Sequence, residues 1–348
     1  MKKLKVIFDW LLRFGLSALL VAFVVMAPFT LFPSLVMAEA NVNRNEVYEY
    51  QGILELWHIE TFEGGSRSRA TFLEQEAINF EKNHKGTYIV IQTMSLEQFK
   101  LNIEAGKKPN MLSFGVGGCD GIEKELVEID ADAIRGDLKS YGKYGAKQLA
   151  VPYILGGYAM IEQKLQSEDS KTNANMSKTG VGLKGTTNPL KALQAASKQI
   201  ATLYDDISMD SYDAYDKFLK GYYGTLIGTQ RDVYRIESRQ QKGLMTDCKF
   251  NFLGRYTDLV QYMSVFEGKE IEEKLCKEFV SQMISENVQK KLKNYNLFST
   301  LENVSLYDSG IYADFEKALS GDLKSENAFV SNEEIRSMKQ EALKNVVK

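Results

Sequence analysis

The sequence is poor in cysteine and histidine. Its 348 residues include three cysteines, Cys119, Cys248 and Cys276, at wide spacings, and two histidines, His58 and His84. An odd number of widely spaced cysteines provides neither a disulfide framework nor a thiolate metal site, and two histidines do not build a multi-histidine zinc site. We therefore expect the cysteines to behave as small hydrophobic residues, and we predict no metal and no cofactor.

The short motifs of common enzyme classes are also missing. Neither G-x-S-x-G nor a P-loop occurs, and the run from Gly115 to Asp120 places Asp120 where the dinucleotide fingerprint requires glycine. The carboxylates of Glu60, Glu63 and Asp258 are available for acid and base chemistry, but nothing in the sequence pairs them. We therefore expect a protein that is not an enzyme.

An excess of basic residues is absent as well. The chain has 43 lysines and arginines against 46 aspartates and glutamates. Without the five charged residues up to Arg13, the counts are 39 and 45, a net charge of −6. A negative net charge without a basic segment does not favour nucleic acid as a partner.

A charge-free run from Phe14 to Met37 follows a lysine-rich start and precedes the A-x-A motif at 38–40. This order is typical of a signal peptide, so residues 1–40 predict export. We favour cleavage because Pro28 and Pro33 interrupt the run. A continuous helix of this length, at about 1.5 Å per residue, would also cross a hydrocarbon core of about 30 Å, so an uncleaved membrane anchor stays open. No cysteine near the end of the run offers a lipid anchor.

Strand and helix patterns alternate from Gly52 to Phe114. Apolar runs bounded by turn residues indicate buried strands, and apolar residues recurring every three or four positions indicate amphipathic helices. Ser95 has the position of a helix N-cap. Alternating strands and helices imply parallel pairing and an α/β fold. The predicted strands are 53–57, 88–92 and 111–114, and the predicted helices are 70–82 and 95–106.

The second half of the chain continues the α/β pattern after a polar segment, 163–187, that we interpret as a mobile surface loop. Asn188 and Pro189 predict a helix start with a side-chain cap and a first-turn proline. Further helices are predicted from Ser211, from Gln230, over 271–283 and around 288–292. Further strands are predicted over 222–227, 250–253 and 259–266.

Five segments in a fixed order resemble one known family. They read LELWHIETFEGG, LEQFKLNIEAGKKPNMLSFG, AVPYILGGYAMI, GYYGTLIGTQRDVYRI, and DLVQYMSVF followed by EKLCKEFVSQMISENVQKKL. Together, over about residues 51–320, they are similar to the extracellular solute-binding proteins, family 1, of ABC importers.

The resemblance implies an α/β, two-lobed periplasmic-binding-protein-like fold of type II. Each lobe would be a mixed sheet flanked by helices, and a hinge with several crossings would join the lobes. The implied division gives 51–150 plus 257–285 to lobe 1 and 155–253 plus 286–348 to lobe 2, with crossings near 151–157, 254–258 and 285.

The implied function is capture of a small polar solute, most commonly a carbohydrate, between the lobes and its delivery to the permease subunits of an ABC transporter. We expect a bacterial protein that works as a monomer at the outer face of the membrane or in the periplasm, tethered only if the N-terminal segment is uncleaved. The alternative is a membrane-tethered sensor or surface binding module with the same fold and no role in transport.

Aromatic and polar residues at strand ends and helix starts are the candidate contacts of this solute. Aromatic faces bury the C–H faces of sugar rings, while charged and amide groups bond to hydroxyls. Trp57 also fits the core, because it ends an apolar strand. The turn at 64–66 offers backbone N–H groups to an anion, so a phosphate or carboxylate ligand stays open as an alternative. The candidates are Trp57, His58, Glu60, Phe62, Phe114, Tyr153, Tyr158, Gln230, Arg231, Tyr256 and Asp258.

Overall fold

The computed structural model describes residues 48–164, 177–203 and 208–347, with some residues between Gly15 and Met26 that are helical and exposed. The A-x-A motif, most of the charge-free run and the middle of the polar segment 163–187 lie outside the described residues. The prediction of a loop is wrong for the end of that segment, because residues 178–181 form a strand that pairs within the second sheet. Within the described part of the chain, no helix has both the length and the apolar character that a membrane crossing requires. The chain divides into a unit up to Gly52 and a unit from Ile53 onward. The sheets and their helices form the second unit.

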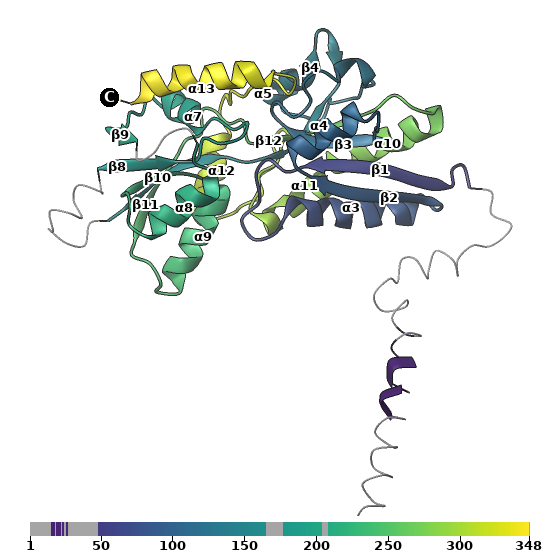
Figure 1. Cartoon of the computed structure of the whole chain (residues 1–348), viewed down its shortest axis with the longest axis horizontal. Helices are drawn as coiled ribbons and strands as arrows, with labels where there is room; N and C mark the ends of the chain where they lie inside the picture. Colours follow the sequence, from purple (N-terminus) through teal and green to yellow (C-terminus); the bar gives the residue numbers. More distant parts are fainter. Residues whose placement is uncertain are drawn as a thin grey trace, which may run out of the picture. The chain divides into compact units, whose positions relative to one another are not determined.

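The first sheet is mixed, as the family resemblance implies, and not all parallel as the alternation of strands and helices suggested (Figure 1). β1 and β3 pair in parallel, so that Trp57 lies beside Leu112, whereas β12 is antiparallel to β3 and to β6. Every residue of β3, β6 and β12 is buried, as in the interior of an α/β layer structure. The strand order is β2 (Thr87–Met94), β1 (Gly52–Ile59), β3 (Met111–Gly115), β12 (Val260–Val265) and β6 (Val151–Leu155).

Amphipathic helices accompany this sheet and form the first lobe with it. The side chains of Ser68 and Ser95 cap α3 and α4 by accepting backbone N–H groups, which confirms the predicted cap at Ser95. α10 packs on α3 and on β12. The helices are α3 (Arg69–Asn83), α4 (Leu96–Glu104), α5 (Gly136–Lys139), α10 (Glu270–Met283) and α11 (Glu286–Gln289), with 3-10 turns η1 (Glu123–Glu125), η2 (Ser140–Gly142) and η3 (Lys290–Tyr295) and a hairpin of β4 (Lys143–Tyr144) and β5 (Lys147–Gln148).

The second sheet is also mixed and forms the second lobe with its helices. β10 is antiparallel to β7 and parallel to β8. It begins later than the predicted 222–227, because Tyr222 to Gly224 still belong to the turn, where the Tyr223 hydroxyl donates to the Ala214 carbonyl. The strand order is β11 (Cys248–Phe252), β7 (Tyr158–Gln163), β10 (Thr225–Thr229), β8 (Lys178–Val181) and β9 (Thr202–Leu203).

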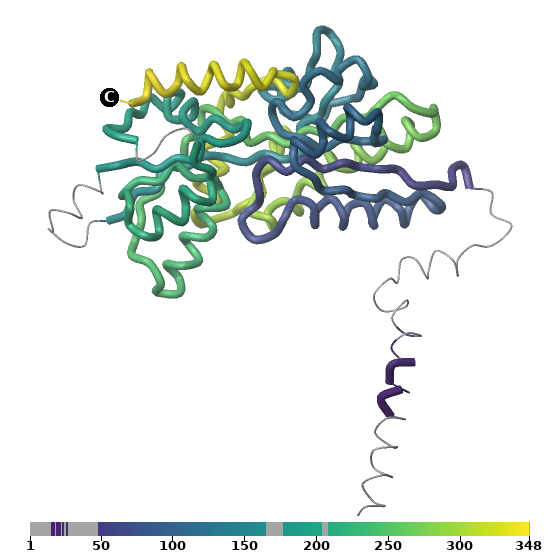
Figure 2. Tube along the Cα trace, viewed as in Figure 1, coloured from purple at the N-terminus to yellow at the C-terminus, as the bar shows by residue number. Residues whose placement is uncertain are grey.

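Helices of the second lobe come from two distant parts of the sequence. Figure 2 shows the C-terminal helix α13 running along α7, and the two helices are in contact. Pro189 occupies the first turn of α7 as predicted, but the predicted side-chain cap at Asn188 is wrong because that side chain makes no capping bond. The helices are α7 (Pro189–Ala195), α8 (Ser211–Leu219), α9 (Gln230–Gln241), α12 (Ile311–Leu319) and α13 (Asn332–Val346).

The chain passes between the sheets more than once. β6 ends at Leu155 and β7 begins at Tyr158, and the chain returns between β11 and β12. The two crossing segments lie side by side: the Gly156 N–H donates to the Leu259 carbonyl at 2.7 Å, and the Thr257 hydroxyl donates to the Gly156 carbonyl at 3.0 Å. The predicted two-lobed α/β fold is confirmed, and these paired segments connect the two sheets.

The stretch after α10 lies first beside the first sheet and then beside the second. The buried Gln289 side chain donates to the Tyr153 carbonyl at 2.7 Å, and Phe298 forms an antiparallel bridge with Leu155. α12 then packs on β11. The chain therefore reaches the helices of the second lobe only after it has paired with β6.

Candidate functional site

A cavity of about 300 Å³ opens between the lobes, next to the crossing segments. On the first-lobe side it is lined by the loop Glu60–Glu63, which follows β1, and by Leu259, ahead of β12. On the second-lobe side it is lined by the start of β7, the end of β10 and the first turns of α7, α8 and α9. Strand ends and helix starts of open α/β sheets are common ligand positions. We call this space the interlobe cavity.

Four of the predicted site residues line the interlobe cavity: Glu60, Phe62, Tyr158 and Arg231. Phe62 is 8% exposed, and the Arg69 guanidinium lies over its ring at 4.3 Å. Arg231 is half-buried, and this burial lowers the pKa of its guanidinium, which stays protonated at neutral pH. The cavity therefore combines aromatic faces with a cation and a carboxylate from opposite lobes.

Two further predicted residues lie directly behind the cavity wall. The buried Gln230 side chain donates to the Glu63 carbonyl at 2.8 Å and accepts the Gly157 N–H at 3.0 Å. It thus fastens the first-lobe loop to the crossing segment. Asp258 is also buried and accepts the Tyr158 hydroxyl at 2.5 Å. Both side chains position groups that line the cavity.

Trp57 lies in the core of the first lobe. It is 3% exposed and meets the Phe99 ring of α4 edge-on, with 6.2 Å between the ring centroids. The indole packs against Phe99 of α4 and does not line the interlobe cavity. Trp57 was expected to contact the solute, but this packing places it in the core, as the alternative interpretation had it.

The other four predicted residues are buried away from the cavity. The Ser113 hydroxyl joins His58 Nδ1 at 2.8 Å and the Tyr153 hydroxyl at 2.7 Å. Burial and, secondarily, the nearby Arg69 hold the pKa of His58 well below its ordinary value, so the imidazole is neutral. Phe114 packs beside Tyr262, and the Tyr256 hydroxyl donates to Glu326 at 3.0 Å.

Arg69 supports the first-lobe wall of the cavity and has no strong signal in the sequence. It is fully buried, and its guanidinium donates to Gln261 while it covers Phe62. Its backbone N–H donates to the Glu63 carboxylate at 3.0 Å, at the start of α3. Arg69 therefore holds both the ring of Phe62 and the end of the Glu60–Glu63 loop in place.

The turn at 64–66 is closed by the protein itself. The Gly65 N–H donates to the Tyr295 carbonyl at 2.8 Å, and the Ser66 hydroxyl donates to the Asn294 carbonyl at 2.8 Å. A Cβ on Gly64 would come within 2.4 Å of the Tyr295 carbonyl oxygen, so this position requires glycine. The Gly65 N–H, one of the groups considered for an anion at this turn, is thus already bonded.

The buried Asp258 gives the stability of the folded protein a pH dependence. Burial raises the pKa of its carboxyl to about 6, from 3.8, although bonds from the Tyr158 hydroxyl and the Asn188 N–H favour the charged form. Between these values the folded protein holds a proton that the unfolded chain has released, so the free energy of unfolding falls as pH rises. Relative to Asp258→Asn, wild-type stability should fall by up to about 3 kcal/mol from about pH 4 to about pH 7. Urea unfolding at a series of pH values measures this difference, and a difference independent of pH contradicts the assignment.

Residues that the sequence reading missed complete the second-lobe wall. Tyr212 lies at the start of α8 with 64% of its surface exposed, and Arg235 lies one helical turn after Arg231. The capping box of Thr229 and Asp232 fixes the start of α9 and so places both arginines. The spacing of Arg231 and Arg235 was a signal available in the sequence, because residues four apart share a helix face.

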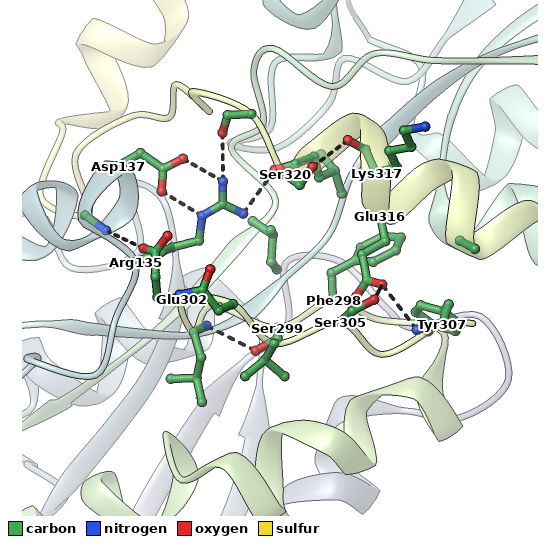
Figure 3. A pocket seen from close by; sticks show the side chains of 18 residues that line it. Arg135, Asp137, Phe298, Ser299, Glu302, Ser305, Tyr307, Glu316, Lys317 and Ser320 are labelled. Atoms are coloured by element: carbon green, nitrogen blue, oxygen red, sulfur yellow. Dashed lines mark hydrogen bonds and ion pairs between the residues drawn. The ribbon is translucent and has the colours of Figure 1, made fainter. Parts of the chain in front are cut away.

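A larger hollow, of about 670 Å³, is lined by residues that include Leu155 and Phe298 (Figure 3). Its charged groups already bond to the protein: Arg135 donates to Asp137 at 2.6 and 2.7 Å and to the Leu319 carbonyl at 3.0 Å. The Glu316 carboxylate accepts backbone N–H groups of the loop at 306–307. None of the predicted site residues lines it. These groups hold loops together, and the interlobe cavity remains the candidate site.

No family model matches the sequence, and no curated protein is significantly similar to it. Solved structures are similar in fold. The GacH receptor of Streptomyces glaucescens, determined unliganded and with acarbose, is 15% identical, covering 86% of this chain and 95% of that chain, with a TM-score of 0.60. The sugar-binding protein MalE of Xanthomonas citri is 11% identical, covering 85% and 92%, with a TM-score of 0.61.

Iron-bound HitA of Pseudomonas aeruginosa shares the fold as well, at 12% identity, covering 83% of this chain and 99% of that chain, with a TM-score of 0.54. These proteins are binding proteins, and together they define the architecture: the chain has the two-lobed fold of periplasmic solute-binding proteins. In the described residues, no group of three or more His, Cys, Asp or Glu side chains is arranged to hold a metal ion.

Proposed function

We propose that the protein is an extracytoplasmic solute-binding protein of an ABC importer that captures a carbohydrate in the interlobe cavity. The observation that carries this proposal is the cavity itself. It lies at the hinge, and both lobes line it, with Phe62 and Glu60 from one and Tyr158, Tyr212 and Arg231 from the other. A solute that touches both walls binds a closed arrangement more tightly and shifts the hinge equilibrium toward it.

The chemistry of the cavity suits a sugar. Aromatic rings cover the apolar faces of sugar rings, at about 25 cal/mol per Å² of apolar surface buried, and the carboxylate and guanidinium groups bond to hydroxyl pairs. We propose Glu60, Phe62, Tyr158, Tyr212, Arg231 and Arg235 as the contacts. The sugars bound by GacH and MalE support this class of ligand, because these proteins share the fold over most of both chains.

The lobe division and the cellular context follow from the same proposal. We assign 51–150 and 257–298 to the first lobe and 155–253 with the C-terminal helices to the second, so that the last crossing lies between Phe298 and α12 and not near 285. The protein acts outside the cytoplasm, after export directed by residues 1–40, and hands its solute to permease subunits. It acts as a monomer.

Isothermal titration of the exported form tests the function. The panel holds neutral mono-, di- and trisaccharides, amino sugars, sugar acids and phosphorylated sugars, with ferric citrate as a matched probe for the ligand class of HitA. We expect at least one carbohydrate to bind with micromolar or tighter affinity and ferric iron to give no heat. If the folded protein binds iron and none of the sugars, the proposal is overturned.

A further inference from the structure

Three arginines of α9 lie along one face of that helix. Arg231, Arg235 and Arg239 follow one another at four-residue intervals, so each lies about 6 Å further along the helix axis than the one before. Arg231 and Arg235 line the interlobe cavity, and Arg235 and Arg239 line a hollow of about 470 Å³ between α8 and α9. The arginine row runs out of the interlobe cavity and along this second hollow, which we call the α8–α9 groove.

The cavity and the groove are adjacent, because Tyr212 and Arg235 line both of them. α8 and α9 lie side by side in the second lobe (Figure 1). Tyr212 is 64% exposed at the junction, and deeper in the groove the Arg235 guanidinium lies over the Tyr215 ring at 5.0 Å. An elongated ligand that enters the cavity therefore has a path past an aromatic ring onto the surface of the second lobe.

The groove is basic. Arg235, Arg239 and Lys242 line it together with one carboxylate, Asp216, and that carboxylate is already paired with Lys220 at 2.6 Å. Guanidinium groups bind planar carboxylate and sulfate groups through two parallel hydrogen bonds. A neutral sugar would not require this row of cations, whereas an acidic one would use it.

We propose that the solute is an anionic oligosaccharide, an inference that rests on the solute-binding function proposed above. One ring occupies the interlobe cavity, and the following rings pass over Tyr212 into the α8–α9 groove. Their acidic groups meet Arg235 and Arg239, because the four-residue spacing along the helix is comparable to the length of one sugar ring. Lys242 stands at the far end of the row and attracts the acidic chain electrostatically.

Titration with matched sugars tests this proposal. The probes are an α-1,4-linked tetramer of galacturonic acid, the methyl ester of the same tetramer, and the monomer. We expect the acid tetramer to bind at least tenfold tighter than its neutral ester and than the monomer, with an affinity that falls as ionic strength rises. Arg239→Gln and Lys242→Gln should each weaken the tetramer several-fold and leave the monomer unchanged. Arg336→Gln on the exposed surface of α13 is the matched control.

The outcomes separate this inference from the underlying function. If no sugar of any kind binds to folded protein, the solute-binding function fails. If a monosaccharide or neutral sugar binds but the acid tetramer gains nothing over its ester, the groove proposal alone is overturned. Equal losses for tetramer and monomer in both groove variants also contradict it, because they would show a general effect on the second lobe. Circular dichroism confirms that each variant is folded.

Discussion

Trp57→Ala should lower the free energy of unfolding by about 3 to 5 kcal/mol, the range for truncating a large buried aromatic residue. The indole is 3% exposed and packs edge-on against Phe99, so alanine leaves a cavity between β1 and α4. Urea unfolding followed by circular dichroism measures the loss. Sugar affinity of the folded fraction should stay within about twofold of wild type, because the indole does not line the interlobe cavity.

Leu101→Ala is the control for this substitution. Leu101 lies on α4, but its side chain is 53% exposed, so we expect a change within about 0.5 kcal/mol. If Trp57→Ala abolishes sugar binding while stability is unchanged, Trp57 contacts the solute and its placement in the core is wrong. That is the outcome that the strand-end position of Trp57 favours when the sequence is considered alone.

Arg231→Ala should weaken carbohydrate binding by about ten- to hundredfold, which corresponds to the loss of charged hydrogen bonds to sugar hydroxyls. Arg231 lies in the first turn of α9, half-buried in the cavity wall opposite the Glu60–Glu63 loop. Since its side chain caps no helix and fills no core position, the free energy of unfolding should change by less than about 1 kcal/mol. Titration calorimetry and urea unfolding give the two quantities.

Arg336→Ala removes the same charge from the exposed face of α13 and should leave affinity unchanged. Equal affinities of wild type and Arg231→Ala, with the fold intact, would move the solute site out of the interlobe cavity. A similar loss in both arginine variants would instead indicate a non-specific effect of net charge.

The strands and helices were predictable from the sequence because their signals are local, whereas the two-lobed arrangement followed from the family resemblance. The alternating strands and helices up to Phe114 and the cap at Ser95 depend on neighbouring residues only. Boundaries were less predictable where tertiary contacts decide them. Tyr223 folds back onto α8 and delays the start of β10.

The candidate site was predictable only in part, because lining a cavity depends on what covers each strand end. Phe62 follows the end of β1 and Arg231 lies in the first turn of α9, and both line the cavity, although the Arg69 guanidinium lies over the Phe62 ring. Trp57 occupies a similar position in the sequence, but α4 lies over it. In the sequence, Arg69 is only a residue near the start of a helix. Its contacts with Phe62 and Gln261 in the folded protein show that it is buried and holds the cavity wall in place.

A crystal structure with the tightest-binding sugar of the panel tests the central claim most directly. We expect a sugar ring in the interlobe cavity, between Phe62 and Tyr158, with its hydroxyls bonded to Glu60 and Arg231. A sugar held instead in the hollow lined by Arg135 and Glu316, or bound to one lobe without contact to the other, would contradict the account.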